Sequence, residues 1–424
     1  MSQKIKEWLG KTNQLYFTLY ATLSAFVVYF CMYAYRKPFT VAKFEGQVSV
    51  ALLGLIDYKI ILIISQVIGY TLSKFLGVKL VSESNYEERG KKIILMLIIA
   101  LFALLGFAIT PRPYNFIFMF INGLPLGMIW GLVFGFLEGR KTSDFMGAGL
   151  SASFIISSGV VKSVGKILLD NGVSEIWMPF LSGLIFFPLL LLSVYLLQQL
   201  PAPSKEDEAL KTKRLPMNSL ERKKFFVSYY LGLAPLIFLY MVLTAFRDFR
   251  DNFAREIWDS LGYSAGPEIF SLSEMPIGFV VLIILGALVL FKDPKKTFTF
   301  MFSIMITGAG MISLSTFLFQ THVIGPLPWM ILIGIGLYFC YVPFGCMLFD
   351  NIMALVGTVG TAGFMIYVAD AFGYLGSVFL MLYKNFFAAK LPWLTFFISF
   401  SYATAFICTV GLIFAYFYFQ KKSI

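Results

Sequence analysis

Two arginines at the ends of long apolar stretches are the residues of this sequence best suited to chemistry. Arg36 follows the apolar stretch 15–35 and Arg247 follows the stretch 225–246, so the two lie 211 residues apart in a chain of 424 residues. A guanidinium group binds two oxygens of a phosphate or carboxylate at once, and at membrane depth it persists where it meets an acid or an anion. The pair therefore predicts an anion-binding site, whereas the alternative is that each arginine anchors a helix end at the membrane surface.

The residues around Arg36 strengthen this prediction. Tyr29, Tyr33 and Arg36 are separated by four and three residues, which places them on one face of a helix. Lys37 follows directly and adds a second cation. We predict that Arg36, Arg247, Lys37, Tyr33 and Tyr29 bind substrate.

The stretch 146–169 carries two further cations. Ser158, Lys162 and Lys166 follow one another at steps of four and share a helix face. Lys162 lies near the middle of the stretch, where a charged side chain requires a protein interior or a cavity. We therefore predict that Lys162 and Ser158 also bind substrate.

Three residues of the second half are predicted to act in coupling or gating: Asp370, Tyr374 and Glu274. Asp370 lies inside the stretch 360–383, and Tyr374 and Ser377 fall on its helix face. An acid within a membrane span is a functional candidate with a cationic partner, here Lys162 or Arg247, and the alternative is a structural ion pair. Glu274 is expected near the outer start of the eighth span.

Long apolar helices must position these residues. The chain is 58% hydrophobic and 13% charged, its mean hydropathy is +0.80, and apolar runs of helix length recur throughout. The sequence predicts an all-α integral membrane protein with twelve transmembrane helices in two pseudo-symmetric six-helix halves. The predicted spans are 15–35, 58–78, 93–109, 115–137, 146–169, 177–197, 225–246, 276–291, 298–319, 329–350, 360–383 and 393–419.

One long polar segment divides the chain. We predict a six-helix half over residues 1–200, a cytoplasmic linker over 201–224 and a second six-helix half over 225–424. Residues 1–14 predict a short basic amphipathic helix on the membrane surface rather than a signal peptide. Lysines and arginines gather in the segments at both termini and in the linker, which the positive-inside rule places in the cytoplasm. The outer loop after the seventh span is the exception, because its cations are interleaved with acids.

Composition and motifs also disfavour other classes of protein. The net charge of +11 follows from membrane topology, so nucleic acid is not an expected partner. The four cysteines all lie in apolar runs and are expected to be core residues. The sequence has no P-loop, no metal-ligand cluster and no nucleophile beside a base, so we expect neither an enzyme nor a bound metal or cofactor.

Four stretches resemble one transporter family. "YAYRKPFTVA", which contains Tyr33, Arg36 and Lys37, resembles the first-helix signature Tyr–x–x–Arg–Lys–x–Phe of the organophosphate:phosphate antiporters of the major facilitator superfamily. "GYTLSKFLG" resembles that family's second helix, "FRDFRDNFAREIW" with "SLSEMPIG" resembles its seventh and eighth helices, and "TAGFMIYVADAFGYLGS" resembles its eleventh helix. Glycerol-3-phosphate and hexose-phosphate transporters are members of this family.

The resemblance implies the major facilitator fold and a cavity in which Arg36 and Arg247 hold a phosphate group, assisted by Lys37 and Tyr33. The sequence departs from the family in two places. The loop "GVKLVSESNYEERG" lacks the Asp-Arg pair expected after the second helix, and His322, the one histidine, is expected in an outer loop rather than in the fifth helix.

These observations favour a monomeric transporter in the plasma (inner) membrane that exchanges an organic phosphate, or a similar small anion, for inorganic phosphate. Its expected partners are the anion and the lipid bilayer. One alternative is a proton-coupled symporter of another solute that uses Asp370 and Lys162. The other alternative is a membrane sensor that binds a ligand on the same scaffold without transporting it.

Overall fold

The structure is a computed structural model of the whole chain. It describes residues 2–50, 54–82, 86–138, 140, 142–202, 219–263, 266–287, 293–357 and 363–423. Most of the predicted cytoplasmic linker, residues 203–218, lies outside the described residues, as do residues 288–291 and 360–362 of two predicted spans.

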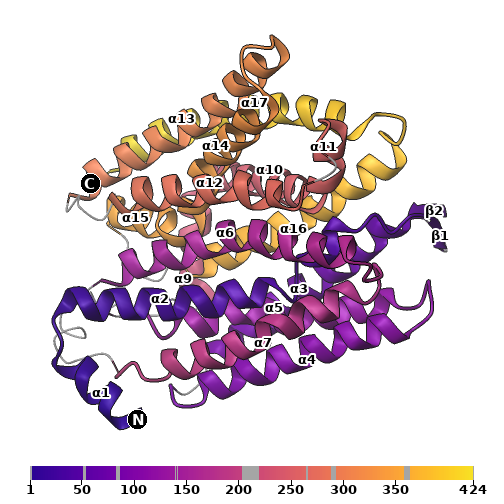
Figure 1. Cartoon of the computed structure of the whole chain (residues 1–424). Coiled ribbons are helices and arrows are strands. Elements are labelled where there is room, and N and C mark those ends of the chain that lie inside the picture. The colour runs from indigo at the N-terminus through magenta and orange to yellow at the C-terminus, as the bar shows by residue number, and fades with distance from the viewer. Residues whose placement is uncertain are drawn as a thin grey trace. The chain divides into compact units, whose positions relative to one another are not determined.

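Twelve long helices dominate the described part of the chain, each with 19 residues or more, and they confirm the all-α membrane fold with twelve spans (Figure 1). Ten of them are long and apolar enough to cross a membrane on the criteria of length and composition, and α3 and α16 complete the set. The twelve are α2 (Gln14–Tyr33), α3 (Tyr58–Ser82), α4 (Arg89–Ile109), α5 (Phe116–Phe134), α6 (Ser143–Asp170), α7 (Met178–Leu197), α10 (Tyr230–Asn252), α12 (Glu268–Ala287), α13 (Pro294–Gln320), α14 (Pro326–Cys346), α16 (Gly363–Phe386) and α17 (Trp393–Lys421).

Short elements connect or flank these helices. The predicted N-terminal helix is present as α1 (Ser2–Lys11). Two short elements after the first span were not predicted from the sequence. They are a 3-10 helix and the antiparallel hairpin that follows this 3-10 helix. The remaining short elements are η1 (Pro38–Val41), β1 (Gln47–Val50), β2 (Gly54–Asp57), α9 (Ser219–Ser228), α11 (Ala254–Ser260) and α15 (Leu348–Leu355).

The chain divides into two compact units. The first unit contains Met1–Lys211 together with Asn252–Arg255 and Tyr263–Met275, and the second contains Thr212–Asp251, Glu256–Gly262 and Pro276–Ile424. The end of α10 and the first turns of α12 therefore pack with the N-terminal helices. The division of the chain into two six-helix halves, residues 1–200 and 225–424, with a linker over 201–224, remains a prediction.

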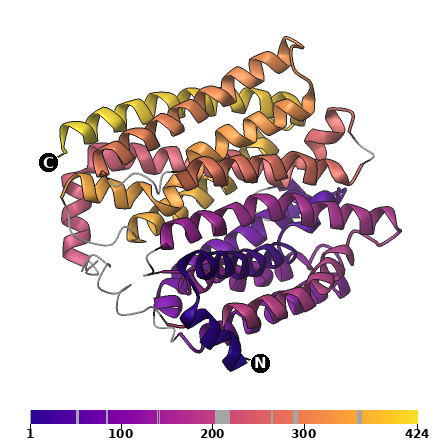
Figure 2. The ribbon, with the colours of Figure 1, turned by 60° about the vertical axis from the view of Figure 1, so that its left-hand side comes forward.

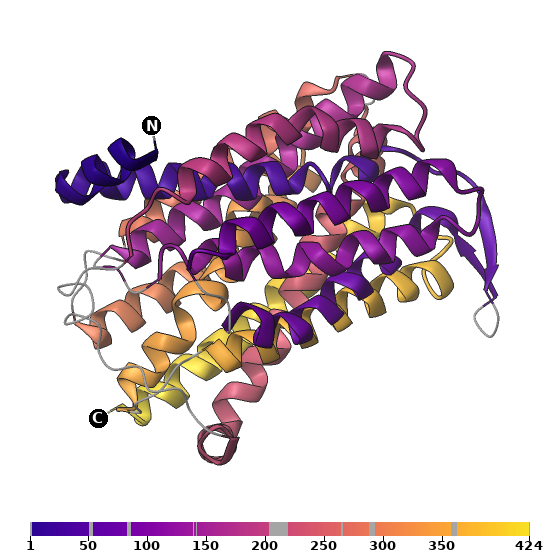
Figure 3. The ribbon, with the colours of Figure 1, turned by 90° about the horizontal axis from the view of Figure 1, so that it is seen from below.

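Close helix packing holds the first unit together. Gly69 of α3 and Gly123 of α5 face one another's helices, and a Cβ at either position would collide with a backbone carbonyl of the partner helix. Beside them, Gln66 donates a buried hydrogen bond of 2.8 Å to Asn122. Two backbones can approach this closely only where no side chain intervenes, which is a common way to pack membrane helices. Figure 3 shows α1 and the β1–β2 hairpin at opposite ends of this unit.

The second unit is built from the later helices, which run beside one another in orange and yellow in Figure 2. Helix α13 packs against both α14 and α17. Aromatic side chains fill the spaces between these helices, and Trp329 of α14 stacks on Phe319 of α13 with ring centroids 4.0 Å apart. Such pairs combine a large buried apolar area with a favourable ring geometry.

Three helix ends differ from the sequence prediction near the candidate site. Helix α2 ends at Tyr33, so Arg36 lies in the turn after the helix. Helix α10 continues to Asn252, so Arg247 lies within a helix and not at the start of an outer loop. Helix α12 begins at Glu268, eight residues before the predicted start. Hydropathy underestimates α10 and α12 because their outer turns carry charged residues that the protein buries, such as Asp248 and Glu274.

Candidate anion-binding site

Arg36 is held in a buried turn between α2 and η1. Its backbone N–H donates to the carbonyl of Tyr33, and the N–H of Lys37 donates to the same carbonyl, so the turn continues the helix end. The side chain of Arg36 is buried, and its guanidinium carbon lies 3.9 Å from the centre of the Tyr70 ring on α3. A guanidinium stacked in this way keeps its N–H edges in the plane of the group, where two oxygens of one anion can bind.

A second cation approaches the same ring. The ammonium nitrogen of Lys74, one turn after Tyr70 on α3, lies 5.4 Å from the ring centre. Both cations lie within about 6 Å of the centre of one aromatic ring, whose electrons stabilise positive charge.

The two predicted tyrosines of α2 lie together. Tyr29 and Tyr33 are both buried, with ring centroids 5.7 Å apart, and Tyr29 also meets the edge of Trp130 on α5 at 5.1 Å. Tyr29, Tyr33 and Arg36 were predicted to lie on one helix face. Because α2 ends at Tyr33, only the two tyrosines lie on the helix, and Arg36 lies in the turn that follows.

Lys37 is tied to another element of the first unit. Its ammonium group donates a buried hydrogen bond of 2.8 Å to the side-chain oxygen of Asn252, the last residue of α10. The ammonium group of Lys59, at the start of α3, donates a hydrogen bond of 2.7 Å to the carbonyl of Thr40 in η1. These two lysines fix the segment that carries Arg36, so Lys37 has a positioning contact in addition to its charge.

Helix α6 places Ser158, Lys162 and Lys166 in the protein interior, as their spacing predicted. Lys162 is one of the most deeply buried large side chains of the chain, with 2% of its surface exposed. The neighbouring Gly159 lets the first turns of α12 approach, because a Cβ there would lie 2.8 Å from the Cβ of Glu274. Glu274 is thus buried against α6.

Buried charge in the first unit is strongly biased toward cations. Within the described residues of this unit, six Lys or Arg side chains are buried, whereas Glu274 is the one buried carboxylate. Two of the six lie at the ends of helices or loops, where Arg140 binds backbone carbonyls and Lys166 pairs with Asp170. The buried cations are Arg36, Lys37, Lys59, Arg140, Lys162 and Lys166.

Arg247 sits in a hydrogen-bonded cluster of the second unit. Its Nε and one Nη donate to the same oxygen of Asp248, at 3.1 and 2.7 Å, and the second oxygen of Asp248 accepts 2.8 Å from Ser377 on α16. Asp248 is buried with 2% of its side chain exposed. A carboxylate therefore occupies the edge of Arg247 that an oxyanion would use.

A chain of hydroxyl groups links Arg247 to Asp370. Arg247 donates to the hydroxyl of Tyr341 on α14, that hydroxyl lies 2.9 Å from the hydroxyl of Tyr240 on α10, and Tyr240 donates 2.7 Å to Asp370 on α16. Each hydroxyl carries one proton, so Tyr341 must donate to Tyr240 when Tyr240 donates to the carboxylate. Asp370 is thus connected to Arg247, one of its two predicted partners.

Close packing of α10 and α16 supports this cluster. A Cβ at Gly373 would lie 2.6 Å from the hydroxyl of Thr244, so these helices need glycine at that point. Tyr374 is buried next to it, and the guanidinium carbon of Arg247 lies 6.0 Å from the Tyr374 ring and 4.5 Å from the Tyr341 ring. Each unit therefore holds an arginine against the face of a tyrosine.

Several polar residues of these clusters were not predicted from the sequence: Tyr70, Asp248, Tyr240 and Tyr341. Asp248 directly follows Arg247, and an acid beside a membrane arginine was a signal that could have found it. The tyrosines gave no such signal, because the sequence contains 22 tyrosines and most patterns of them arise from packing.

A separate polar cluster closes the other end of the first unit. The Nε of Arg140 donates a hydrogen bond of 3.0 Å to the carbonyl of Phe136. One Nη of Arg140 donates to the carbonyl of Pro201 and to the hydroxyl of Tyr86. The Tyr86 hydroxyl in turn donates a hydrogen bond of 2.8 Å to the carbonyl of Leu200. Burial raises the pKa of Tyr86 above its ordinary value, while Arg140 acts in the opposite direction. The cluster joins the loop lacking the Asp-Arg pair to the segment after α7.

Among the residues that the structure describes, no three His, Cys, Asp or Glu side chains gather into a possible metal site. The arrangement offers cations, hydroxyl groups and three buried carboxylates, which suit binding of an anion and transfer of a proton.

Comparison with known proteins gives a family and a fold. The model of one protein family, "Family of unknown function (DUF5690)", matches residues 38–422. No curated protein matches the sequence. The structure resembles that of a D-xylose-proton symporter, with a TM-score of 0.60 and 15% identity over 95% of this chain and 97% of the other.

Two structures of the peptide transporter POT, both of one point mutant, are also similar. The complex with sulfate has a TM-score of 0.60 and 13% identity over 100% of this chain and 99% of the other. The complex with alafosfalin has a TM-score of 0.57 and 14% identity over 97% of each chain. These similarities show the major facilitator fold.

Proposed function

Since the chain belongs to the DUF5690 family and has the major facilitator fold, we propose that it is a secondary active transporter of a small anion. The substrate is an organic phosphate or a similar anion, moved by alternating access in exchange for inorganic phosphate. The fold alone leaves the substrate open, so the proposal depends on the side chains of the site.

The charge balance of the first unit carries the proposal. With Arg140 and Lys166 set aside, four buried cations remain for one buried carboxylate among the described residues: Arg36, Lys37, Lys59 and Lys162 against Glu274. Buried charges are stable when opposite charge and hydrogen bonds surround them. Ammonium and guanidinium groups gathered in this way are the groups that bind a phosphate or a carboxylate.

The geometry of the arginines supports a phosphate group in particular. Arg36 and Arg247 each lie against a tyrosine ring, at 3.9 and 4.5 Å, and are 211 residues apart in a chain of 424 residues. Stacking restricts a guanidinium to one plane, so its paired N–H groups are oriented before the substrate arrives. Planar, paired donors match two oxygens of one phosphate.

Exchange follows from the same charges. A transporter whose interior is rich in cations is more stable with a bound anion than without one, so a conformational change without cargo is disfavoured. Inorganic phosphate binds the same donors as a phosphate ester and is a suitable return cargo. Asp248 offers an internal carboxylate that neutralises Arg247 when no substrate is bound.

The distribution of lysine and arginine completes the proposal. The positive-inside rule places both termini in the cytoplasm, which corresponds to a multi-pass protein of the plasma membrane. The expected partners are the anion and the lipid bilayer, and a single chain with two halves can form the whole pathway without a second copy.

Phosphate counterflow in proteoliposomes tests this function. Wild-type protein should exchange labelled for unlabelled phosphate, and Arg36→Lys and Arg247→Lys should each abolish exchange, because lysine keeps the charge but lacks the planar pair of donors. Arg222→Lys, on the exposed face of α9, is the matched control and should exchange normally. Absence of phosphate flux in the wild type would reject phosphate as a cargo.

The hydroxyl chain favours a second candidate function, proton-coupled symport. Arg247, Tyr341, Tyr240 and Asp370 form one continuous hydrogen-bonded series, and such series conduct protons in pumps and transporters. Protonation of Asp370 would remove a negative charge that faces Arg247 through this series. Solute binding at Arg247 and proton binding at Asp370 could then depend on each other.

Two variants distinguish the candidates. If uptake is coupled to protons, Asp370→Asn and Tyr240→Phe should abolish uptake driven by a pH gradient and leave exchange intact. If the protein is a simple exchanger, both variants should alter thermal stability or substrate choice instead. Tyr402→Phe, on the surface of α17, controls for the loss of a tyrosine hydroxyl. Ligand binding by the wild type without any flux would favour a sensor.

A further inference from the structure

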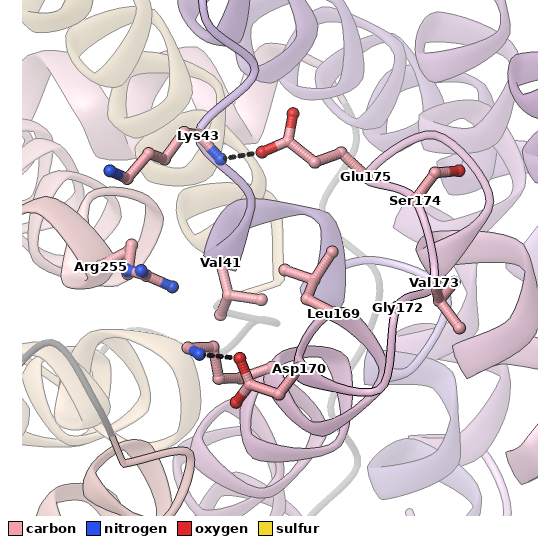
Figure 4. A pocket seen from close by; sticks show the side chains of 10 residues that line it. Val41, Lys43, Leu169, Asp170, Gly172, Val173, Ser174, Glu175 and Arg255 are labelled. Carbon is pink, nitrogen blue, oxygen red and sulfur yellow. Dashed lines mark hydrogen bonds and ion pairs between the residues drawn. The ribbon is translucent and has the colours of Figure 1, made fainter.

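A charged cavity of about 420 Å³ lies within the first unit, apart from Arg36 and Tyr70. It is formed where the end of η1, the end of α6, the turn after α6 and the first residues of α11 meet. Its volume is in the range of pockets that bind small ligands. The charged groups lining it are Lys43, Lys166, Asp170, Glu175 and Arg255 (Figure 4).

Glu175 forms one wall of this cavity. One of its carboxylate oxygens accepts a hydrogen bond of 2.8 Å from the backbone N–H of Lys43, and the other accepts one of 3.2 Å from the backbone N–H of Phe44. Arg112, outside the lining, lies 3.7 Å from the same carboxylate. The negative charge of Glu175 is therefore engaged in holding the chain that carries Lys43.

Asp170 is engaged in a similar way. It forms an ion pair with Lys166, one turn earlier on α6, and this pair lines the floor of the cavity. Figure 4 shows the two carboxylates on one side, whereas the side chains of Lys43 and Arg255 extend on the other. Lys43 is exposed to solvent and Arg255 is half-buried, so both can be reached from water.

The lining of the cavity carries more cations than carboxylates. Three cations and two carboxylates line it, and both carboxylates already have partners on the wall. A concave surface with net positive charge concentrates anions from solution. The lining also offers the hydroxyl of Ser174 as a neutral hydrogen-bonding group.

We propose that this cavity binds a small anion through Lys43 and Arg255, at a site separate from the one that contains Arg36. The ligand carries a phosphate or carboxylate group, because these groups pair with both ammonium and guanidinium donors. Lys43 lies in the loop between the first two spans, before β1, and Gly172 and Glu175 lie in the loop after α6; the predicted topology puts both loops on the outer side. A role in capturing substrate before transport rests on the proposed function, but the binding itself does not.

Direct binding of labelled inorganic phosphate to the purified full-length protein tests the site. Equilibrium dialysis should find two classes of site in the wild type. The double variant Lys43→Gln with Arg255→Gln should weaken one class about tenfold or more, as expected for loss of hydrogen bonds from charged groups. The control Lys390→Gln, an exposed cation on the loop after α16, should bind like the wild type. Unchanged binding in the double variant would overturn the proposal.

A second measurement does not require removing the cations. Ser174→Cys places a small thiol in the lining, and Thr321→Cys places one on an exposed turn elsewhere. Phosphate should slow modification of the first thiol by a membrane-impermeant thiol reagent and leave the second unaffected. Equal rates with and without phosphate at both positions would contradict the site even if the double variant failed to fold.

These outcomes separate the cavity from the transport proposal. Arg36→Lys should abolish exchange and retain phosphate protection of Ser174→Cys. A wild type without phosphate flux but with that protection would reject phosphate exchange and support the cavity. Normal exchange without protection would reject the cavity and support exchange.

Discussion

The guanidinium carbon of Arg36 lies 3.9 Å from the centre of the Tyr70 ring, so an arginine in the turn after one helix rests on the face of a tyrosine in the next. The ring stabilises the cation and holds its donors in one plane. A side chain of α3 thus helps to orient Arg36.

Replacement of Tyr70 should affect substrate affinity through the ring. Tyr70→Leu is expected to raise the KM for phosphate exchange by about 5- to 30-fold, since a desolvated cation–π contact contributes about 1–2 kcal/mol. Tyr70→Phe keeps the ring and should stay near the wild type. Counterflow at graded phosphate concentrations measures both. A similar loss in the two variants would show that the hydroxyl, and not the ring, is what matters.

Removal of the carboxylate next to Arg247 should have the opposite effect on affinity. Asp248→Asn leaves Arg247 without its internal anion, so phosphate binding should become about tenfold tighter, as expected for a hydrogen bond between charged groups, and turnover should slow. Ser377→Ala, which removes a donor to Asp248 but keeps the charge, should show a smaller shift in the same direction. Weaker phosphate binding in Asp248→Asn would mean that the carboxylate positions Arg247 and does not compete with the substrate.

Two glycines allow a matched test of helix packing. Gly123→Ala should destabilise the protein by about 1–3 kcal/mol, because the new methyl group meets the backbone of α3, which cannot move aside easily. Gly310→Ala lies inside α13 with no atom within 4 Å of the new methyl group, and it should be neutral or stabilising by up to about 1 kcal/mol. Thermal unfolding in detergent compares them. Equal melting temperatures would indicate that α3 and α5 can separate at low cost.

The cluster around Arg140 should contribute to stability in a way that depends on its planar group. Arg140→Lys loses at least one of its contacts to Phe136 and Pro201 and should destabilise the protein by about 1–2 kcal/mol in thermal unfolding. Arg222→Lys on exposed α9 is the control. The pKa of Tyr86 is raised on folding, so the contribution of this group is fully present below its ordinary pKa of about 10 and is lost as pH rises through the raised value. Loss of stability between pH 7 and 9 would therefore have another origin.

Most of the fold could be predicted because the membrane restricts what an apolar run of 20 residues can form. All twelve long helices were located from such runs. Helix ends were less predictable where charge is buried: α12 starts at Glu268 although Glu268 and Glu274 lower its hydropathy. The hairpin formed by β1 and β2 was missed, since neither strand is longer than four residues.

The site was predictable in part, residue by residue. Charged residues within apolar runs, such as Arg36, Lys162 and Asp370, attract notice because their burial is energetically unfavourable. Their neutral partners do not, since Tyr70 and Tyr240 resemble the other tyrosines of the chain until the helices are packed.

The contact between Tyr29 and Trp130 gives the protein an optical reporter of its own. The ring centroids of Trp130 and Tyr29 lie 5.1 Å apart in a T-shaped arrangement, and Trp130 also stacks on Phe134, one turn along α5, with centroids 6.4 Å apart. Five of the six tryptophans lie elsewhere in the sequence, so replacing them by phenylalanine would leave Trp130 as the single tryptophan. Its emission wavelength and quenching would then follow the polarity beside Tyr29 and Tyr33 in real time, without a label and without transport.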